Sequence, residues 1–235
     1  MTTYLKNAQK TDENAILLSA GDMWQGSAES NMTKGKILVD WMNELNFAAM
    51  AIGNHEFDYG MDGRINVTDT WASFPYTSCN FYYETAGVRG ANVLDPYVTL
   101  NCGAVDVAFV GITTPESFTK TTPAYFQDEH GNYIYGISAG PDGQALYNDV
   151  QTAIDGAKTN GAEYVIALGH LGDDAGSAPY TSAATIANVS GLSAFIDGHS
   201  HSVVEGSTVT DKNGNSVLLT QTAEYFNRIG MMIID

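Results

Sequence analysis

Basic residues are scarce in this sequence. Lys and Arg together number 10 against 27 Asp and Glu, which gives a formal net charge of −17. A surface of that sign repels the phosphate backbone of nucleic acids, so we exclude binding to a nucleic-acid polymer. A small anionic substrate is not excluded, because a bound divalent cation reverses the local field. The simplest interpretation of the acidity is solubility.

Cysteine is also scarce, and long apolar runs are missing. Cys79 and Cys102 form neither a metal-type cluster nor a disulfide framework, although the sequence leaves one bridge between them open. The first residues do not read as a signal peptide, and no apolar run is long enough to span a bilayer. No linker or internal repeat divides the 235 residues, so we predict one domain over residues 1–235.

Short apolar segments of two kinds alternate along the chain. Period-3.6 spacing predicts helices at 36–45, 144–159 and 183–189. Compact apolar runs predict strands at 15–20, 48–52, 105–111, 164–168, 194–196, 217–220 and 231–234. The turn at 212–215 and the segments between 74 and 100 predict hairpins. The alternation favours an α/β protein, and the hairpins favour mixed β-sheets.

Polar side chains follow several of these strands directly, each after a glycine. The carboxyl ends of strands in layered α/β proteins converge on one edge, and glycine lets the backbone turn sharply there. A single buried histidine is more often a hydrogen-bonded core residue than a ligand, but four of the five histidines share this context. We assign no role to His130. The residues at these junctions are Asp22, Asn54, His55, His170, His199 and His201.

These residue types indicate a metal site. Asp, Asn and His suit Zn, Mn, Fe or Ni better than thiolate clusters do. A carboxylate that bridges two cations is a recurring solution for phosphoryl transfer. His199 and His201 are two residues apart, a spacing at which both side chains would project the same way if the segment is extended. Asp58 lies where it orients the His55 ring, and the alternative, compatible role is to cap the turn at 59–63.

Five segments, in this order, resemble the calcineurin-like metallophosphoesterases, and more closely the N-terminal catalytic domain of 5′-nucleotidases. The pairing of Gly-Asn-His-Glu with Gly-His-x-His is the most specific part of the resemblance. The resemblance implies a four-layer α/β/β/α sandwich with two mixed β-sheets. The matching segments are 19–27 (SAGDMWQGS), 53–60 (GNHEFDYG), 111–117 (GITTPES), 169–172 (GHLG) and 196–201 (IDGHSH).

The same resemblance implies a role for each junction residue. His55 resembles a catalytic histidine that stabilises the phosphoryl transition state or protonates the leaving oxygen, with Asp58 as its partner. The implied reaction is hydrolysis of phosphate esters, above all nucleoside 5′-monophosphates, by a hydroxide that two divalent metal ions (Zn, Mn, Fe or Ni) activate. The implied ligands are Asp22 as the bridge, Asn54, His170 and His199 on the second metal, and His201 on the first.

Two departures from the family pattern change these expectations. Such enzymes normally begin with a strand that ends in Asp-x-His, but only 20 residues precede Gly21 and none is histidine. We therefore expect a truncated chain that lacks its first strand, with the second metal site more complete than the first. We also expect the C-terminal substrate-binding domain to be absent. The parent protein is expected to be bacterial and extracellular or associated with the cell wall.

Three hypotheses remain open from the sequence. The first is a metal-dependent phosphohydrolase acting on a small-molecule nucleotide or another phosphate ester. The second is a non-catalytic or single-metal binding domain, because the first metal site is incomplete. The third is a plain α/β domain whose polar loop residues are satisfied by the backbone. The sequence leaves the oligomeric state open.

Overall fold

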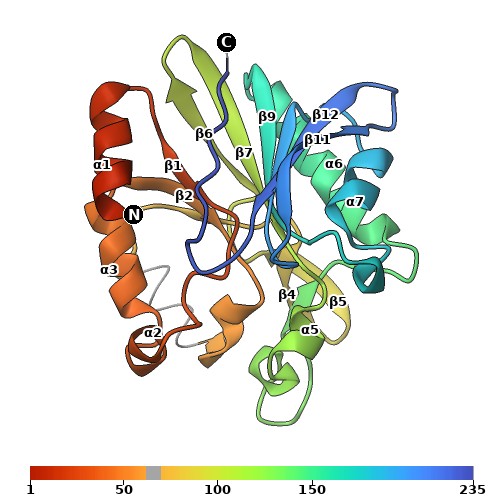
Figure 1. Cartoon of the computed structure of the whole chain (residues 1–235). Helices are drawn as coiled ribbons and strands as arrows, with labels where there is room; N and C mark the ends of the chain where they lie inside the picture. The colour runs from red at the N-terminus through yellow and green to blue at the C-terminus, as the bar shows by residue number, and fades with distance from the viewer. Residues whose placement is uncertain (62–69, 235) are drawn as a thin grey trace.

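The chain folds into four layers, with two β layers enclosed between helices (Figure 1). This computed structural model describes residues 1–61 and 70–234. Helices α6 (Gln144–Thr159) and α7 (Ser182–Asn188) cover one outer face, and α1 (Thr2–Thr11) and α3 (Lys36–Glu44) lie on the opposite side. The α/β class and the layered arrangement expected from the sequence are confirmed.

The largest sheet is mixed and has strand order β11-β12-β10-β9-β7-β6. Its four central strands are parallel, and the edge strands β11 and β6 are antiparallel to their neighbours. The strands are β6 (Tyr97–Cys102), β7 (Val105–Thr113), β9 (Tyr164–His170), β10 (Ala194–Asp197), β11 (Val203–Thr210) and β12 (Ser216–Thr222).

Two smaller sheets complete the β layers. A parallel sheet has order β1-β2-β3, and an antiparallel sheet has order β5-β4-β8. Their strands are β1 (Leu17–Ser19), β2 (Phe47–Ala51), β3 (Tyr76–Thr77), β4 (Phe81–Thr85), β5 (Val88–Asn92) and β8 (Tyr135–Ile137). The short helices are α2 (Ala28–Met32), η1 (His55–Phe57), α5 (Ser117–Lys120), η3 (Pro123–Phe126) and η4 (Ala175–Ser177).

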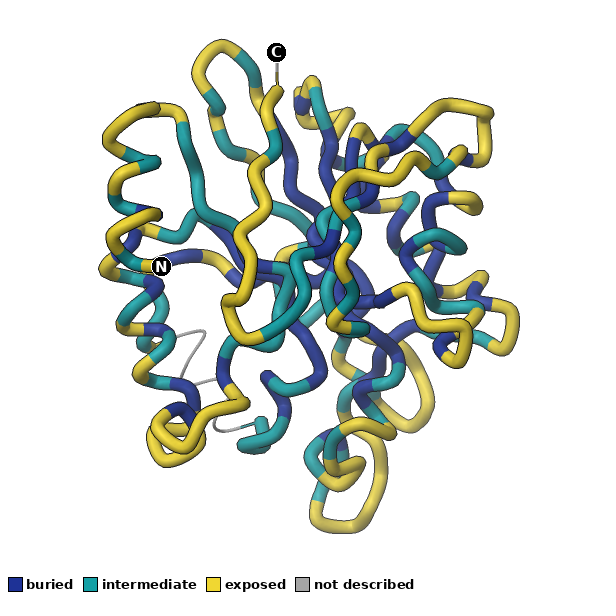
Figure 2. The backbone as a smooth tube through the Cα atoms, in the orientation of Figure 1, coloured by how far each residue is buried: buried dark blue, intermediate teal, exposed yellow. Residues whose placement is uncertain are grey.

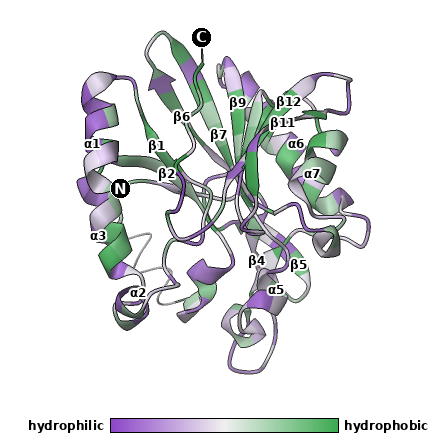
Figure 3. Cartoon of the chain, viewed as in Figure 1, coloured by the Kyte–Doolittle hydropathy of each residue, from purple (hydrophilic) through white to green (hydrophobic). Residues whose placement is uncertain are grey.

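The interface between the sheets is apolar. Ala49 and Ala51 of β2 form one buried cluster with Phe109 of β7 and with Ile166 and Leu168 of β9. Figure 2 shows burial concentrated on these central strands, and Figure 3 shows the hydrophobic colouring of β7. Strands covered on both faces read as continuous apolar runs, which explains why the sequence revealed them. This packing fixes the two sheets relative to each other.

Most predicted elements are present, with small differences at their ends. The predicted helix at 144–159 coincides with α6, and the predicted hairpin at 212–215 joins β11 to β12. The chain also forms α1, which the polar segment 2–11 did not suggest because Leu5 is its one buried residue. Cys79 and Cys102 are free thiols. Among the described residues, no helix is long and apolar enough to cross a bilayer.

The strand predicted at 231–234 is wrong. Those residues have no regular secondary structure and pair with none of the described strands. The left-handed backbone of Ala223, Tyr225 and Phe226, with φ of 61°, 51° and 54°, turns the chain away after β12. Met231 and Ile233 are consequently 81% and 70% exposed. An apolar run forms a strand only where a neighbouring strand supplies hydrogen-bond partners, which local composition does not show.

Candidate metal centre

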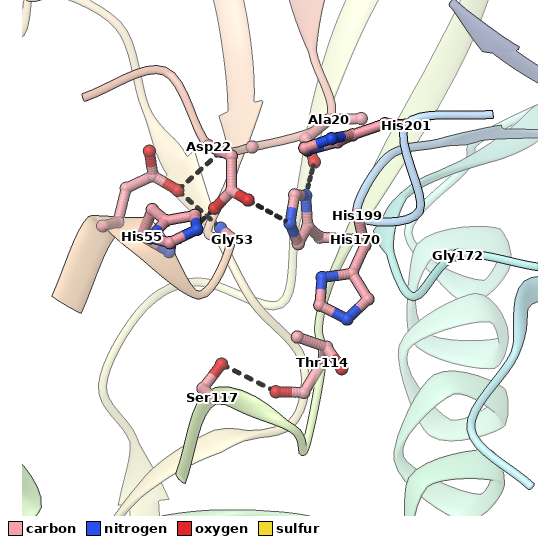
Figure 4. Close-up of polar contacts among 12 residues, drawn as sticks. Ala20, Asp22, Gly53, His55, Thr114, Ser117, His170, Gly172, His199 and His201 are labelled. Atoms are coloured by element: carbon pink, nitrogen blue, oxygen red, sulfur yellow. Dashed lines mark hydrogen bonds and ion pairs between the residues drawn. The ribbon is translucent and has the colours of Figure 1, made fainter. Parts of the chain in front are cut away.

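The predicted site residues gather where strands of both β layers end. Asp22 lies three residues after β1, and Asn54 lies three residues after β2. His170 is the last residue of β9, and His199 lies two residues after β10. Figure 4 shows Asp22, His55, His170 and His199 directed toward a common region from separate segments. The expected convergence of strand ends is therefore present.

Three of these side chains form a cluster with the dimensions of a metal site. Ligand atoms of Asp22, His170 and His199 all lie within 4.8 Å of one another. Asp22 Oδ2 lies 2.8 Å from His170 Nε2, and the two imidazole rings are 5.1 Å apart at their centroids. Metal–ligand bonds of roughly 2 Å place two ligand atoms of one ion at most about 4 Å apart. Small side-chain adjustments would close this cluster around an ion.

Two buried polar atoms of the predicted ligands have no hydrogen-bond partner among the described residues. These atoms are Asn54 Oδ1 and His170 Nε2. The two residues are 2% and 1% exposed. His170 Nε2 nevertheless lies 2.8 Å from Asp22 Oδ2 as an ion pair, so Asn54 Oδ1 is the more fully unpartnered of the two atoms. Buried polar atoms are nearly always satisfied, because leaving one unpaired costs about 1–3 kcal/mol. An amide oxygen, an imidazole nitrogen and a carboxylate together fit a divalent cation.

The backbone is strained where it presents these side chains. Asp22, His199 and His201 have φ of 59°, 79° and 56°, in the left-handed region. Non-glycine residues occupy that region at a cost of roughly 1–2 kcal/mol. Gly21, at φ 98°, has no alternative, because a Cβ there would lie 2.7 Å from Gly53 N. Such strain is typical of functional sites, where surrounding contacts hold an unfavourable turn.

The structure brings His55 and Asp58 together in the predicted pair. His55 Nδ1 lies 2.6 Å from Asp58 Oδ2, and the hydrogen bond to Asp58 raises the pKa of His55 above its usual value. The backbone N–H of His55 donates to Asp22 Oδ1 at 2.8 Å, so the pair is tied to the cluster. The alternative turn at 59–63 lies partly outside the described residues.

His201 is not a member of the three-residue cluster. The segment that carries it is left-handed at His199 and His201, so the extended backbone expected there is wrong. The His201 side chain is 52% exposed, and its Nδ1 forms an ion pair with Glu224. Glu224 follows β12 at the point where the chain turns away from the sheet. The expectation that His201 ligates a metal therefore stays a prediction.

Glu56 is a site residue that sequence reasoning missed. Its carboxylate is fully buried and accepts hydrogen bonds from the backbone N–H groups of Gly53 at 2.7 Å and of Asp22 and Met23 at 2.8 Å each. Burial raises the pKa of Glu56, and the charge of Asp22 adds to that rise. Glu56 thereby joins the loop after β1 to the loop after β2. Its position between His55 and Asp58 was the available signal.

Asp197, at the end of β10, joins the other pair of loops in the same way. Its Oδ1 accepts hydrogen bonds from the backbone N–H groups of Leu171 at 3.0 Å and Gly172 at 3.2 Å, which follow β9. Asp197 is buried, and this burial raises the pKa of its carboxyl group. Asp197 thus fixes the segment that carries His199 relative to the segment that carries His170. It was also missed, although it directly precedes the glycine of its loop.

Glu116, from the segment 111–117, also contacts the cluster. Glu116 Oε2 lies 2.7 Å from His199 Nε2 and accepts a hydrogen bond from Ser177 Oγ at 3.0 Å. Burial opposes ionisation of Glu116, but these hydrogen bonds outweigh it and lower the pKa of the carboxyl. The segment 111–117 is part of the family resemblance, but the resemblance implies no role for Glu116.

The chain is similar to known phosphoesterases in sequence and in fold. Residues 1–203 match the family described as calcineurin-like phosphoesterase. The chain is 32% identical over 176 residues to the snake venom 5′-nucleotidase of Naja atra, covering 72% of this chain and 30% of that protein. The 5′-nucleotidase of Homo sapiens is also 32% identical over 176 residues, covering 72% of this chain and 27% of that protein. The chain thus spans less than a third of these relatives' length.

A solved structure supports the fold. The 5′-nucleotidase precursor from Thermus thermophilus superimposes with a TM-score of 0.75 at 23% identity. The superposition covers 95% of this chain and 42% of that one. At this level of identity the likeness shows a shared arrangement of elements.

Replacing Glu56 by Gln is expected to lower the free energy of unfolding by about 2–4 kcal/mol, because an amide directs its NH2 group at backbone N–H donors and loses the charge. Urea unfolding of the metal-free chain measures this loss. Glu129→Gln, at a side chain that is 88% exposed, is the matched control. Equal stability of the two variants would show that Glu56 does not join the loops.

Replacing Asp22 by Asn is expected to weaken divalent-metal binding at least about tenfold, because the variant loses the only carboxylate in the cluster. Metal content after gel filtration and titration with a chromophoric chelator measure the change. Asp40→Asn, which removes the same charge from the exposed face of α3, should bind metal as the wild type does. Tight binding in Asp22→Asn would count against this carboxylate as a ligand.

Proposed function

Because the chain belongs to the calcineurin-like phosphoesterase family, we propose that it hydrolyses phosphate esters, preferentially nucleoside 5′-monophosphates, using two divalent metal ions. The observation that carries the proposal is the cluster of Asp22, His170 and His199, with the unpartnered oxygen of Asn54 nearby in the same set of loops. We propose that residues 1–235 form the catalytic domain, and that His201 contributes to the first metal site. We also propose an extracellular or cell-wall location, in line with the venom relative.

We assign different roles in this reaction to different residues of the chain. Asp22, Asn54, His170 and His199 would hold the metal. The chemistry supplied by divalent ions in such a site is ionisation of a water near neutral pH and compensation of phosphate charge. Asp22 has its two oxygens engaged on different sides, one by the N–H of His55 and the other by His170. Each oxygen of the Asp22 carboxylate therefore faces a different neighbour, as expected for a carboxylate that bridges two sites.

His55 is placed to act on the phosphate rather than on the metal. With Asp58 accepting a hydrogen bond from Nδ1–H, Nε2 carries a hydrogen to donate only when the ring is protonated. The hydrogen bond to Asp58 favours that form, because it raises the pKa of His55. The His55 side chain is 35% exposed, which allows a substrate to reach it. Charge that develops on a phosphoryl or leaving oxygen is best stabilised by such a fixed donor. The proton would pass from Nε2 to the leaving oxygen.

A polar cleft beside this pair offers room for the rest of a substrate. The cleft has a volume of about 550 Å³, and Asp58 and Tyr59 line it together with Asn31, Lys120 and Thr122. Hydroxyl, amide and ammonium groups dominate this lining. Such groups suit a hydroxyl-bearing leaving group such as a ribose.

A second candidate function is a non-catalytic domain that binds a single metal ion. The observation that favours it is that the three-residue cluster does not include His201, which pairs with Glu224 instead. Such a domain would hold one ion through Asp22, Asn54, His170 and His199, without turnover.

Metal stoichiometry and turnover separate the two candidates. The chain is loaded separately with Zn²⁺, Mn²⁺, Fe²⁺ and Ni²⁺, and bound metal is counted per chain. Hydrolysis is then measured on AMP and on an aryl phosphate. Two bound ions with turnover support the phosphoesterase. One ion without turnover supports the binding domain and contradicts the proposed enzyme.

Replacing His55 by Ala is expected to lower turnover by about 10²–10⁴-fold, because it removes a proton donor without removing a ligand. Metal content should stay near that of the wild type. His130→Ala removes an exposed histidine, 74% accessible at its side chain, and should retain full activity. Loss of metal from His55→Ala in step with activity would show that His55 is a ligand instead.

A further inference from the structure

Glu116 contacts a predicted metal ligand from a distant part of the chain. It lies between β7 and α5, 83 residues before His199, and its Oε2 is 2.7 Å from His199 Nε2. The contact is sheltered, since the side chains of His199 and Glu116 are 9% and 21% exposed. An ion pair on an exposed surface would contribute little, but a sheltered one fixes both groups.

We propose that Glu116 is a positioning residue that sets the tautomer and the direction of the His199 ring for metal binding. An ionised carboxylate only accepts hydrogen bonds, so Nε2 of a neutral His199 must carry the hydrogen. The lone pair then lies on Nδ1, and a metal ligand needs that lone pair. In Figure 4 the two ring nitrogens of His199 face opposite ways, one of them on the side of His170.

The two histidines of the cluster differ in the charge of their outer partners. His170 Nδ1 contacts the neutral carbonyl oxygen of Ala20 at 2.7 Å, whereas His199 contacts a carboxylate. A carboxylate partner raises the basicity of a ligating imidazole more than a carbonyl does. Glu116 adds a negative charge beside His199 to that of Asp22 in the cluster. Glu116 therefore contributes to affinity without touching the ion.

Ser177 holds the carboxylate in place. Its hydroxyl donates to the same Oε2 that faces His199, and Ser177 is itself buried in η4, which follows β9. The backbone of His199 is in the left-handed region, at φ 79°, so its side chain starts from an unusual direction. The contact with Glu116 gives the ring one defined orientation from that starting point.

The test measures metal affinity, and it rests on the proposed function only in requiring a metal at this site. Zn²⁺ and Mn²⁺ affinities of the full chain are measured by competition with a chelating dye for wild type, Glu116→Ala, Glu116→Gln and Ser177→Ala. We expect a loss of about 10–100-fold for Glu116→Ala. Smaller losses are expected for Glu116→Gln, which keeps an acceptor, and for Ser177→Ala. Glu129→Gln, at an exposed acid, is the matched control.

A second readout separates positioning from simple folding defects. The urea midpoint of the metal-free Glu116→Ala chain should stay near that of the wild type, while its Co²⁺ absorption spectrum should change with the ligand field at His199. Wild-type metal affinity in Glu116→Ala would overturn the proposal. An affinity loss matched by a large drop in the metal-free midpoint would also overturn it, in favour of a structural role.

Failure of the proposed function gives a different pattern of results. A wild-type chain that binds metal but hydrolyses neither AMP nor an aryl phosphate would contradict the proposed function, while the affinity difference between wild type and Glu116→Ala would still support the role of Glu116. A wild-type chain that binds no divalent metal would overturn both.

Discussion

The site depends on buried carboxylates that accept hydrogen bonds from the backbone of neighbouring loops. Glu56 binds N–H groups in the loops after β1 and β2, and Asp197 binds N–H groups in the loop after β9. A buried charge is tolerated only when such donors surround it, so each carboxylate imposes one loop geometry. The two contacts convert four flexible strand ends into a defined arrangement. The loops held in this way bring Asp22, His170 and His199 together.

The apolar interface between the sheets sets the distance across which these loops must meet. Asp22 belongs to the layer of β1 and β2, whereas His170 and His199 belong to the layer of β9 and β10. The side chains at this interface determine how closely the layers approach. They are the small Ala49 and Ala51 on one side and the large Phe109 on the other. Interiors pack densely and deform little, so this spacing is stable. The metal cluster is thus a product of core packing as well as of loop sequence.

The sequence predicted what repeats locally and missed what depends on distant contacts. The periodic segment at 144–159 became α6, and the polar residues after the strands do converge. Glu56 and Glu116 were missed because their partners, in the loop after β1 and at His199, lie far away along the chain. The strand expected at 231–234 is wrong for the same reason, since strand formation depends on pairing with a distant segment and these residues pair with none of the described strands.

At Asp22 and His199 the residue that best fits the left-handed backbone differs from the residue that can bind a metal. Glycine is the residue that this conformation favours, and it would relieve the strain of each turn. A carboxylate and an imidazole stand there instead, and neither stabilises its own turn. Selection for thermal robustness alone would therefore tend to erase these side chains. Their presence marks positions where a function, rather than the scaffold, determines the amino acid.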